Sequence, residues 1–155
     1  MDDEEVTFLV CHGAVPALEL LPWGPELCDA FVAVLDVDLL SDDIAQKTAE
    51  DLVRVTVDWV ETMGPKCEFL HDLVDHAAVS AGKQAAVGDG HPMTAWHNDF
   101  SDAEKMASWV CLGGHGLSLN RLVIVFGPDS AVLQFALTLS ELVSRDEGGD
   151  QGNVL

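Results

Sequence analysis

Two cysteine–histidine pairs have the spacing of metal ligands. Cys67 and His71 lie four residues apart, and Cys111 and His115 repeat that spacing. Side chains four residues apart share one face of a helix, so each pair could present one sulfur and one nitrogen. Together they would supply the donors of a tetrahedral zinc site, and zinc is the one cofactor that the sequence suggests. The alternative is that both cysteines are small buried side chains.

Thiol chemistry is a second use for these side chains. Cys11 directly precedes His12 at the end of an apolar segment. Neighbouring side chains of a strand point to opposite faces, which disfavours a Cys11–His12 pair and leaves His71 or His115 as the base. We therefore favour a buried Cys11 beside an exposed His12. No catalytic residue is predicted, because the sequence contains no GxSxG, HExxH or kinase motif.

Three aromatic side chains, Trp96, His97 and Phe100, form a candidate interaction site. They lie in 80–100, a segment rich in glycine and poor in large apolar residues that predicts a long loop. An aromatic side chain on a loop either fills the edge of the core or recognises a ligand, and we favour the former. Residues 127–130 indicate an N-capped turn rather than an anion-binding loop.

The elements that would position these residues alternate between strands and helices. Residues 121–126 form an uninterrupted apolar run, which is typical of a buried strand. Apolar side chains recur at helical spacing from Ile44 to Met63 and stop before Gly64-Pro65, which indicates a helix and its end. Strands are predicted over 6–11, 31–37 and 121–126, and helices over 42–63, 66–80, 101–112 and 130–143.

This alternation predicts an α/β fold, a small sheet of three to four strands covered by amphipathic helices. Residues 1–144 are expected to form a single compact domain, and the polar, glycine-rich residues 145–155 a flexible acidic tail. The alternative is an all-α helical bundle in which 121–143 forms a buried helical hairpin. In that arrangement the chain resembles helical, groove-bearing viral regulators of host cell death.

The charge excludes several classes of partner. The chain of 155 residues carries 27 acidic and 7 basic side chains, a formal net charge of -20. Binding to a nucleic-acid backbone needs a basic patch, and an anionic membrane would repel this surface. The start, Met-Asp-Asp-Glu-Glu, is unlike a basic signal-peptide start, and no apolar run approaches the roughly 18 residues of a membrane span. We therefore expect a soluble, cytoplasmic protein.

The acidic excess has three explanations: adaptation to high salt, plain solubility, or docking of a basic partner. The sequence has no tyrosine and few isoleucines and lysines, a composition that resembles proteins of salt-loving archaea. We favour salt adaptation or solubility over a dedicated cationic partner. Four cysteines without a signal peptide predict reduced thiols.

The sequence therefore predicts a small, acidic, non-catalytic binding or regulatory protein that acts through protein–protein interaction. Its surface charge suits a basic protein partner, and a homodimer is a further assembly to consider. The alternative is a small metal-binding or thiol-dependent enzyme built on the cysteine–histidine cluster.

Overall fold

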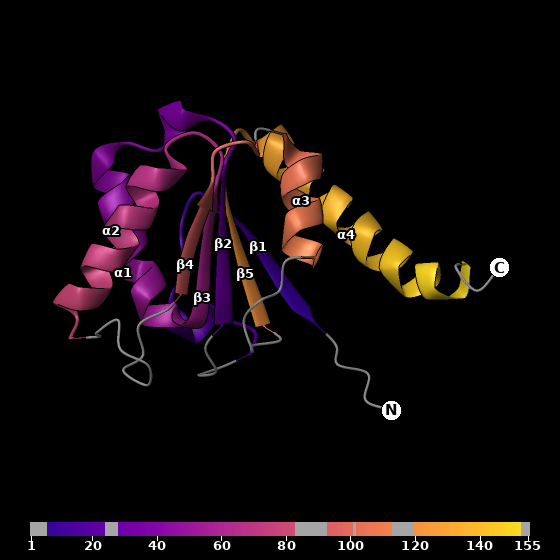
Figure 1. The fold of residues 1–155 in the computed structure, drawn as a ribbon, viewed down its shortest axis with the longest axis horizontal. Coiled ribbons are helices and arrows are strands. Elements are labelled where there is room, and N and C mark those ends of the chain that lie inside the picture. Colours follow the sequence, from indigo (N-terminus) through magenta and orange to yellow (C-terminus); the bar gives the residue numbers. More distant parts are fainter. Residues whose placement is uncertain (1–5, 24–27, 83–92, 101, 113–119, 153–155) are drawn as a thin grey trace.

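A parallel sheet lies between two pairs of helices in the computed structural model of the protein (Figure 1). The structure describes residues 6–23, 28–82, 93–100, 102–112 and 120–152. The strands are β1 (Thr7–His12), β2 (Cys28–Val34), β3 (Thr56–Met63), β4 (Met93–His97) and β5 (Asn120–Phe126). The helices are α1 (Asp42–Val55), α2 (Cys67–Ser80), α3 (Ala103–Leu112) and α4 (Asp129–Gly152), with short 3-10 turns η1 (Leu18–Leu20) and η2 (Val37–Leu39).

The strands are ordered β1-β5-β2-β3-β4, and every neighbouring pair is parallel. The central strand β2 is buried along its whole length, and β5 is buried from Arg121 to Phe126. Apart from Asp29 in β2 and Asn120-Arg121 at the start of β5, both strands are apolar because their two faces are covered, as in other parallel sheets. Their register sets Val32 beside Ile124 in the middle of the core.

The helices divide between the two faces of the sheet. Helices α1 and α2 pack on one face, and α3 and α4 pack on the other (Figure 1). Each helix follows a strand of a parallel sheet, so all four helices begin at the carboxyl end of the sheet. Two separate apolar clusters result, one under each pair of helices.

The predicted α/β class is confirmed, with five strands instead of three to four, and the all-α alternative is wrong. The buried strand predicted over 121–126 is β5, and the helices predicted over 66–80 and 101–112 are α2 and α3. Among the described helices, none has the length and apolar character needed to cross a membrane.

The helix predicted over 42–63 is wrong in its second half. Helix α1 ends at Val55, and β3 occupies Thr56–Met63. Trp59 and Met63 match a helical spacing, but they also lie on one face of a strand. A separation of four residues is close to one helical turn of about 3.6 residues and equals two strand repeats of about 2 residues. The β-branched run that begins at Val55 favours the strand.

Other segments also differ from the predictions, among them 31–37, where β2 ends at Val34 and η2 begins at Val37. The loop predicted over 80–100 contains β4, whose five residues are too few to give a clear periodic signal, while 83–92 lie outside the described residues. Helix α4 spans Asp129–Gly152 and so extends past the helix predicted over 130–143, while the flexibility of 145–155 stays a prediction.

Candidate functional site at the carboxyl end of the sheet

Acidic side chains gather at the carboxyl end of the sheet. Each of the four helices has at least one carboxylate in its first turn, where the helix dipole favours negative charge. The loops that follow β2 and β4 add further aspartates. We call this set the acidic rim: Asp36, Asp38, Asp42, Asp43, Glu68, Asp99, Asp102, Glu104 and Asp129.

Among the described residues, a lysine and a histidine each contact a member of the acidic rim. Lys66 Nζ lies 3.1 Å from Asp42 Oδ1, and His12 Nδ1 lies 3.0 Å from Asp129 Oδ1. Both partners of the second pair are largely exposed, so the contact contributes little stability. The rim remains acidic after these pairs are counted.

The crevice between β2 and β5 is closed. In open parallel sheets, ligands bind where successive helices leave to opposite faces, as α1 and α4 do here. The backbone N–H groups of Leu35 and Asp36 both donate to Phe126 O, at 2.8 and 2.9 Å. A Cβ added at Gly127 would lie 3.3 Å from Leu35 Cβ. This close packing leaves β3 and β4 as the candidate location of a site.

A buried carboxylate holds a histidine at the ends of β3 and β4. Glu61 is 1% exposed, and its Oε2 accepts hydrogen bonds from His97 Nε2 at 3.0 Å and from Trp109 Nε1 at 3.3 Å. A carboxylate only accepts, so the proton of this hydrogen bond lies on His97 Nε2. The arrangement orients one imidazole from the buried side.

The turn after β3 fixes the end of β4. Gly64 has φ +91°, a conformation that favours glycine, and its N–H donates to His97 O at 3.0 Å. A Cβ at this position would collide with the carbonyl oxygen of Val34. This turn therefore requires glycine at position 64, and the turn in turn fixes the position of His97.

An aromatic-walled pocket adjoins His97. The His97 ring lies 5.3 Å from the Phe100 ring and 4.6 Å from the Trp109 ring, measured between centroids. Both Phe100 and Trp109 line a pocket of about 490 Å³, a volume in the range of ligand sites. The other side chains around it come from the start of α3 and the residue before it: Asp102, Glu104, Lys105 and Ser108.

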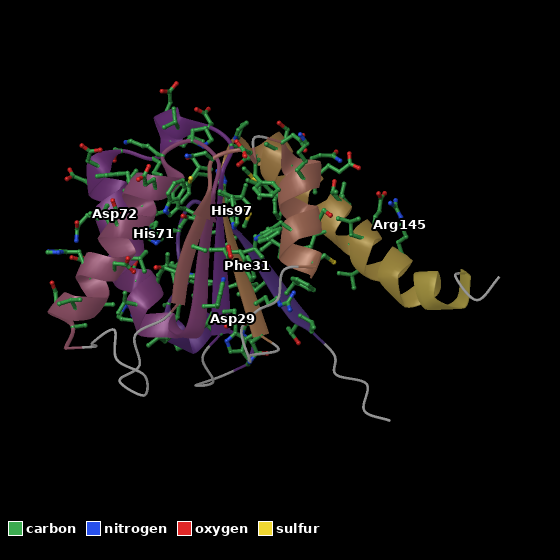
Figure 2. All side chains as sticks on the ribbon, viewed as in Figure 1. Asp29, Phe31, His71, Asp72, His97 and Arg145 are labelled. Carbon is green, nitrogen blue, oxygen red and sulfur yellow. The ribbon has the colours of Figure 1, made fainter. Side chains whose placement is uncertain are left out.

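A second polar cluster occupies the opposite face of β4, under α2. Thr94 Oγ1 lies 2.9 Å from His71 Nε2 and 2.8 Å from Asp75 Oδ1. His71 Nδ1 donates to Asp72 Oδ1 at 3.0 Å. Figure 2 shows His71 and Asp72 on the α2 side and His97 across the sheet from them. One short strand therefore positions two histidine clusters, one on each face.

Two buried residues of opposite charge lie near the amino ends of β2 and β5. Asp29 and Arg121 are register partners, and both are buried. Burial lowers the pKa of Arg121, while the Asp29 carboxylate raises it again. The guanidinium donates from Nη1 to Val110 O at 2.7 Å, near the C-terminus of α3. The Arg121 hydrogen bond ties α3 to the sheet at the end opposite to the acidic rim.

The structure does not bring the predicted zinc ligands together. Cys67 and His71 lie on α2, while Cys111 lies on α3 across the sheet, and His115 lies outside the described residues. Cys67 Sγ donates to Asn98 Oδ1 at 3.1 Å. Within the described part of the chain, no group of three or more His, Cys, Asp or Glu side chains is arranged to hold a metal ion.

Burial protects three of the four thiols, those of Cys11, Cys28 and Cys67. All four cysteines lack a disulfide partner. Burial raises the pKa of Cys11 and of Cys67, and burial together with the neighbouring Asp29 raises the pKa of Cys28 to about 12. A raised thiol pKa lowers the fraction of thiolate, the reactive form.

Two of the three predicted interaction residues meet. His97 and Phe100 are in contact, whereas Trp96 lies on the opposite face of β4, 38% exposed, with its ring 6.5 Å from that of His71. The sequence did not predict Glu61 or Thr94 as site residues, nor that Trp109 would bind Glu61 and line the pocket. The available signal for Glu61 was its place as the single charged residue in the segment 59–63.

Comparison with known proteins gives one match. Residues 9–130 match a family described as "Domain of unknown function (DUF7684)". No curated protein and no solved structure matches the chain.

Proposed function

The chain belongs to the DUF7684 family, whose description names no activity, and from its own site we propose that it is a small acidic binding protein. Its partner is a protein with a basic segment. The acidic rim attracts that segment, and the pocket beside His97 receives one of its cationic side chains.

The observation that carries this proposal is the coincidence of the acidic rim with an aromatic-walled pocket. A lysine or arginine side chain gains from the ring faces of Phe100 and Trp109 and from the carboxylates of Asp102 and Glu104. Lys105 also lines the pocket, on a flexible stem whose exposed ammonium can turn toward solvent. The net charge of -20 adds long-range attraction and speeds association.

Binding of a labelled oligo-arginine peptide, followed by fluorescence anisotropy, tests the proposal. Glu104→Gln removes one carboxylate of the pocket and is expected to weaken binding about threefold at low ionic strength. The matched control is Glu50→Gln, which removes one exposed carboxylate from α1, where Glu50 contacts Gln46. The control is expected to bind the peptide like the unmodified protein.

Equal weakening by both variants would refute the site, because it would mean attraction by net charge alone. Salt gives a second criterion. If the acidic residues serve a partner, the protein alone is stable in dilute buffer, and peptide binding weakens as salt is added. A protein that folds only in concentrated salt would instead support salt adaptation as the reason for its charge.

A further inference from the structure

We propose that Thr94, His71 and Asp72 form a hydrolytic site on edge strand β4, with Thr94 as nucleophile and His71 as general base. The substrate class is a carboxylic ester that is uncharged or cationic. This site is separate from the acidic rim and the pocket, and the proposal does not depend on the binding function.

The distances are those of a nucleophile and its base. Thr94 Oγ1 lies 2.9 Å from His71 Nε2, within the range over which an imidazole removes a hydroxyl proton. Thr94 comes from β4 and His71 from the middle of α2, so two rigid elements hold the contact. Their separation of 23 residues in the chain means that the fold, not local sequence, creates it.

The second nitrogen of His71 is held by a carboxylate. His71 Nδ1 lies 3.0 Å from Asp72 Oδ1, and the proposal uses the tautomer in which Nδ1 donates to this carboxylate and the Nε2 lone pair is directed at Thr94. Asp72 is a positioning residue, because it acts through His71. The same three roles define the serine–histidine–aspartate triads.

Asp75 supplies a further interaction when the base accepts the proton. Its Oδ2 lies 3.7 Å from His71 Nε2, so a carboxylate flanks the imidazolium that forms. Its Oδ1 also lies 2.8 Å from Thr94 Oγ1. Thr94 donates its single hydroxyl proton to Asp75 in the resting site, so attack requires the hydroxyl to rotate until that proton points to His71 Nε2.

The surroundings define the substrate class. Asp72 and Asp75 repel an anionic substrate, whereas an ester carries no charge at its reacting carbon. The half-exposed Trp96 ring, next to His71, offers an apolar surface for the acyl or alcohol group. Among the described strands, β4 pairs with β3 alone, and the proposal places the developing oxyanion against a backbone N–H on the outer side of β4.

The reaction balances without a cofactor. Thr94 Oγ forms a bond to the ester carbonyl carbon while its proton passes to His71 Nε2. The bond from that carbon to the alcohol oxygen then breaks, and the leaving alcohol takes the proton from His71. Water attacks the acyl-Thr94 intermediate by the same proton route, which releases the carboxylic acid and restores the Thr94 hydroxyl.

The test uses the full chain and p-nitrophenyl acetate as the probe. Release of p-nitrophenol gives the rate, and mass spectrometry of acid-quenched protein locates the acetyl group. Thr94→Val, which keeps the shape and removes the hydroxyl, is expected to lower the rate about 100-fold and to abolish the adduct. Thr94→Ser is expected to retain both, because it keeps the nucleophile.

Variants of the other members separate catalysis from structure. His71→Gln is expected to match Thr94→Val, while Asp72→Asn lowers kcat less and leaves KM unchanged. The matched controls are Thr138→Val on α4 and His76→Gln, an exposed histidine of α2, and both are expected to hydrolyse the ester at the unmodified rate. An unchanged rate in Thr94→Val, or an acetyl group on another residue, would overturn the proposal while leaving peptide binding at the rim unaffected.

Discussion

The α1/α2 face of the sheet buries apolar and neutral polar side chains, whereas the α3/α4 face also buries charge. Among the described residues, the buried hydroxyls Thr48 and Thr62 are on the α1/α2 side, where each donates to a backbone carbonyl. The buried charged residues Asp29, Glu61 and Arg121 are all on the α3/α4 side. One sheet therefore presents two interiors of different character.

This difference suggests that the α1/α2 face mainly stabilises the fold, whereas the α3/α4 face also positions the residues of the pocket. Apolar packing is the cheaper way to stabilise a core, and a buried charge costs free energy unless its partners are in place. The α1/α2 face follows the first strategy. The α3/α4 face retains Glu61, which binds His97 and Trp109 next to the pocket, and such groups concentrate at functional sites. We therefore expect substitutions on the two faces to have different consequences.

The largest effect is expected for Arg121→Met. The substitution leaves the buried Asp29 carboxylate without its neighbouring guanidinium and removes the bond to Val110 O. The free energy of unfolding, measured with urea, is expected to fall by about 3–5 kcal/mol. Arg54→Met, at an exposed position of α1, is the control and is expected to change it by less than about 0.5 kcal/mol. Equal losses would remove the distinction between the two faces.

The next effect is a loss of stability in alkali that originates on the α1/α2 face. The pKa of Cys28 is about 12 in the folded protein, against an ordinary value of 9.0. Unfolded chains release this proton at lower pH than folded ones, so its stabilising contribution is complete below pH 9 and is lost as pH rises toward 12. The slope is about 1.4 kcal/mol per pH unit. Urea unfolding of Cys28→Ala at several pH values is expected to show a shallower decline, and an identical slope would contradict the assignment.

Glu61→Gln is expected to cost about 1–3 kcal/mol and to change function as well as stability. The amide oxygen can still accept one hydrogen bond, but His97 and Trp109 no longer share a charged acceptor. Urea unfolding measures the first effect. The oligo-arginine peptide measures the second, because a less constrained His97 and Trp109 alter the pocket wall. Unchanged peptide affinity would mean that Glu61 has a structural role alone.

The smallest effect is expected for Thr62→Val, about 0.5–1.5 kcal/mol. Thr62 Oγ1 donates to Cys67 O at 2.8 Å under α2, and valine replaces the hydroxyl with a methyl group of similar size. Peptide binding and ester hydrolysis are expected to stay unchanged. A loss in either assay would show that the α1/α2 face also controls function, against the division drawn above.

Local patterns predicted the elements that have one dominant signal. The run 121–126 could only be buried, and α2 and α3 carry regular amphipathic spacing. The segment 56–63 failed because its apolar positions fit a helix and a strand equally well. Hydrogen bonding to β2 makes this segment a strand, and that pairing joins residues far apart in the sequence.

The candidate sites were less predictable for the same reason. Glu61 and His97 are 36 residues apart, and Glu61 and Trp109 are 48 apart. Cys67 and His71 have a plausible local spacing, yet their side chains turn to different partners, Asn98 and Thr94. Spacing within one helix indicates a shared face, but it does not say what another element brings to that face.

The position of β4 at the edge of the sheet affects its local opening and the hydrogen exchange of its backbone amides. Its five residues hold His97 for one cluster and Thr94 for the other, and β3 is its one strand neighbour among those described. Edge segments open more readily than central ones, and such an opening would dismantle both clusters at once. We therefore expect a ligand bound at either cluster to slow amide hydrogen exchange along the whole of β4. Thermodynamic reciprocity then predicts that occupancy of one face favours occupancy of the other.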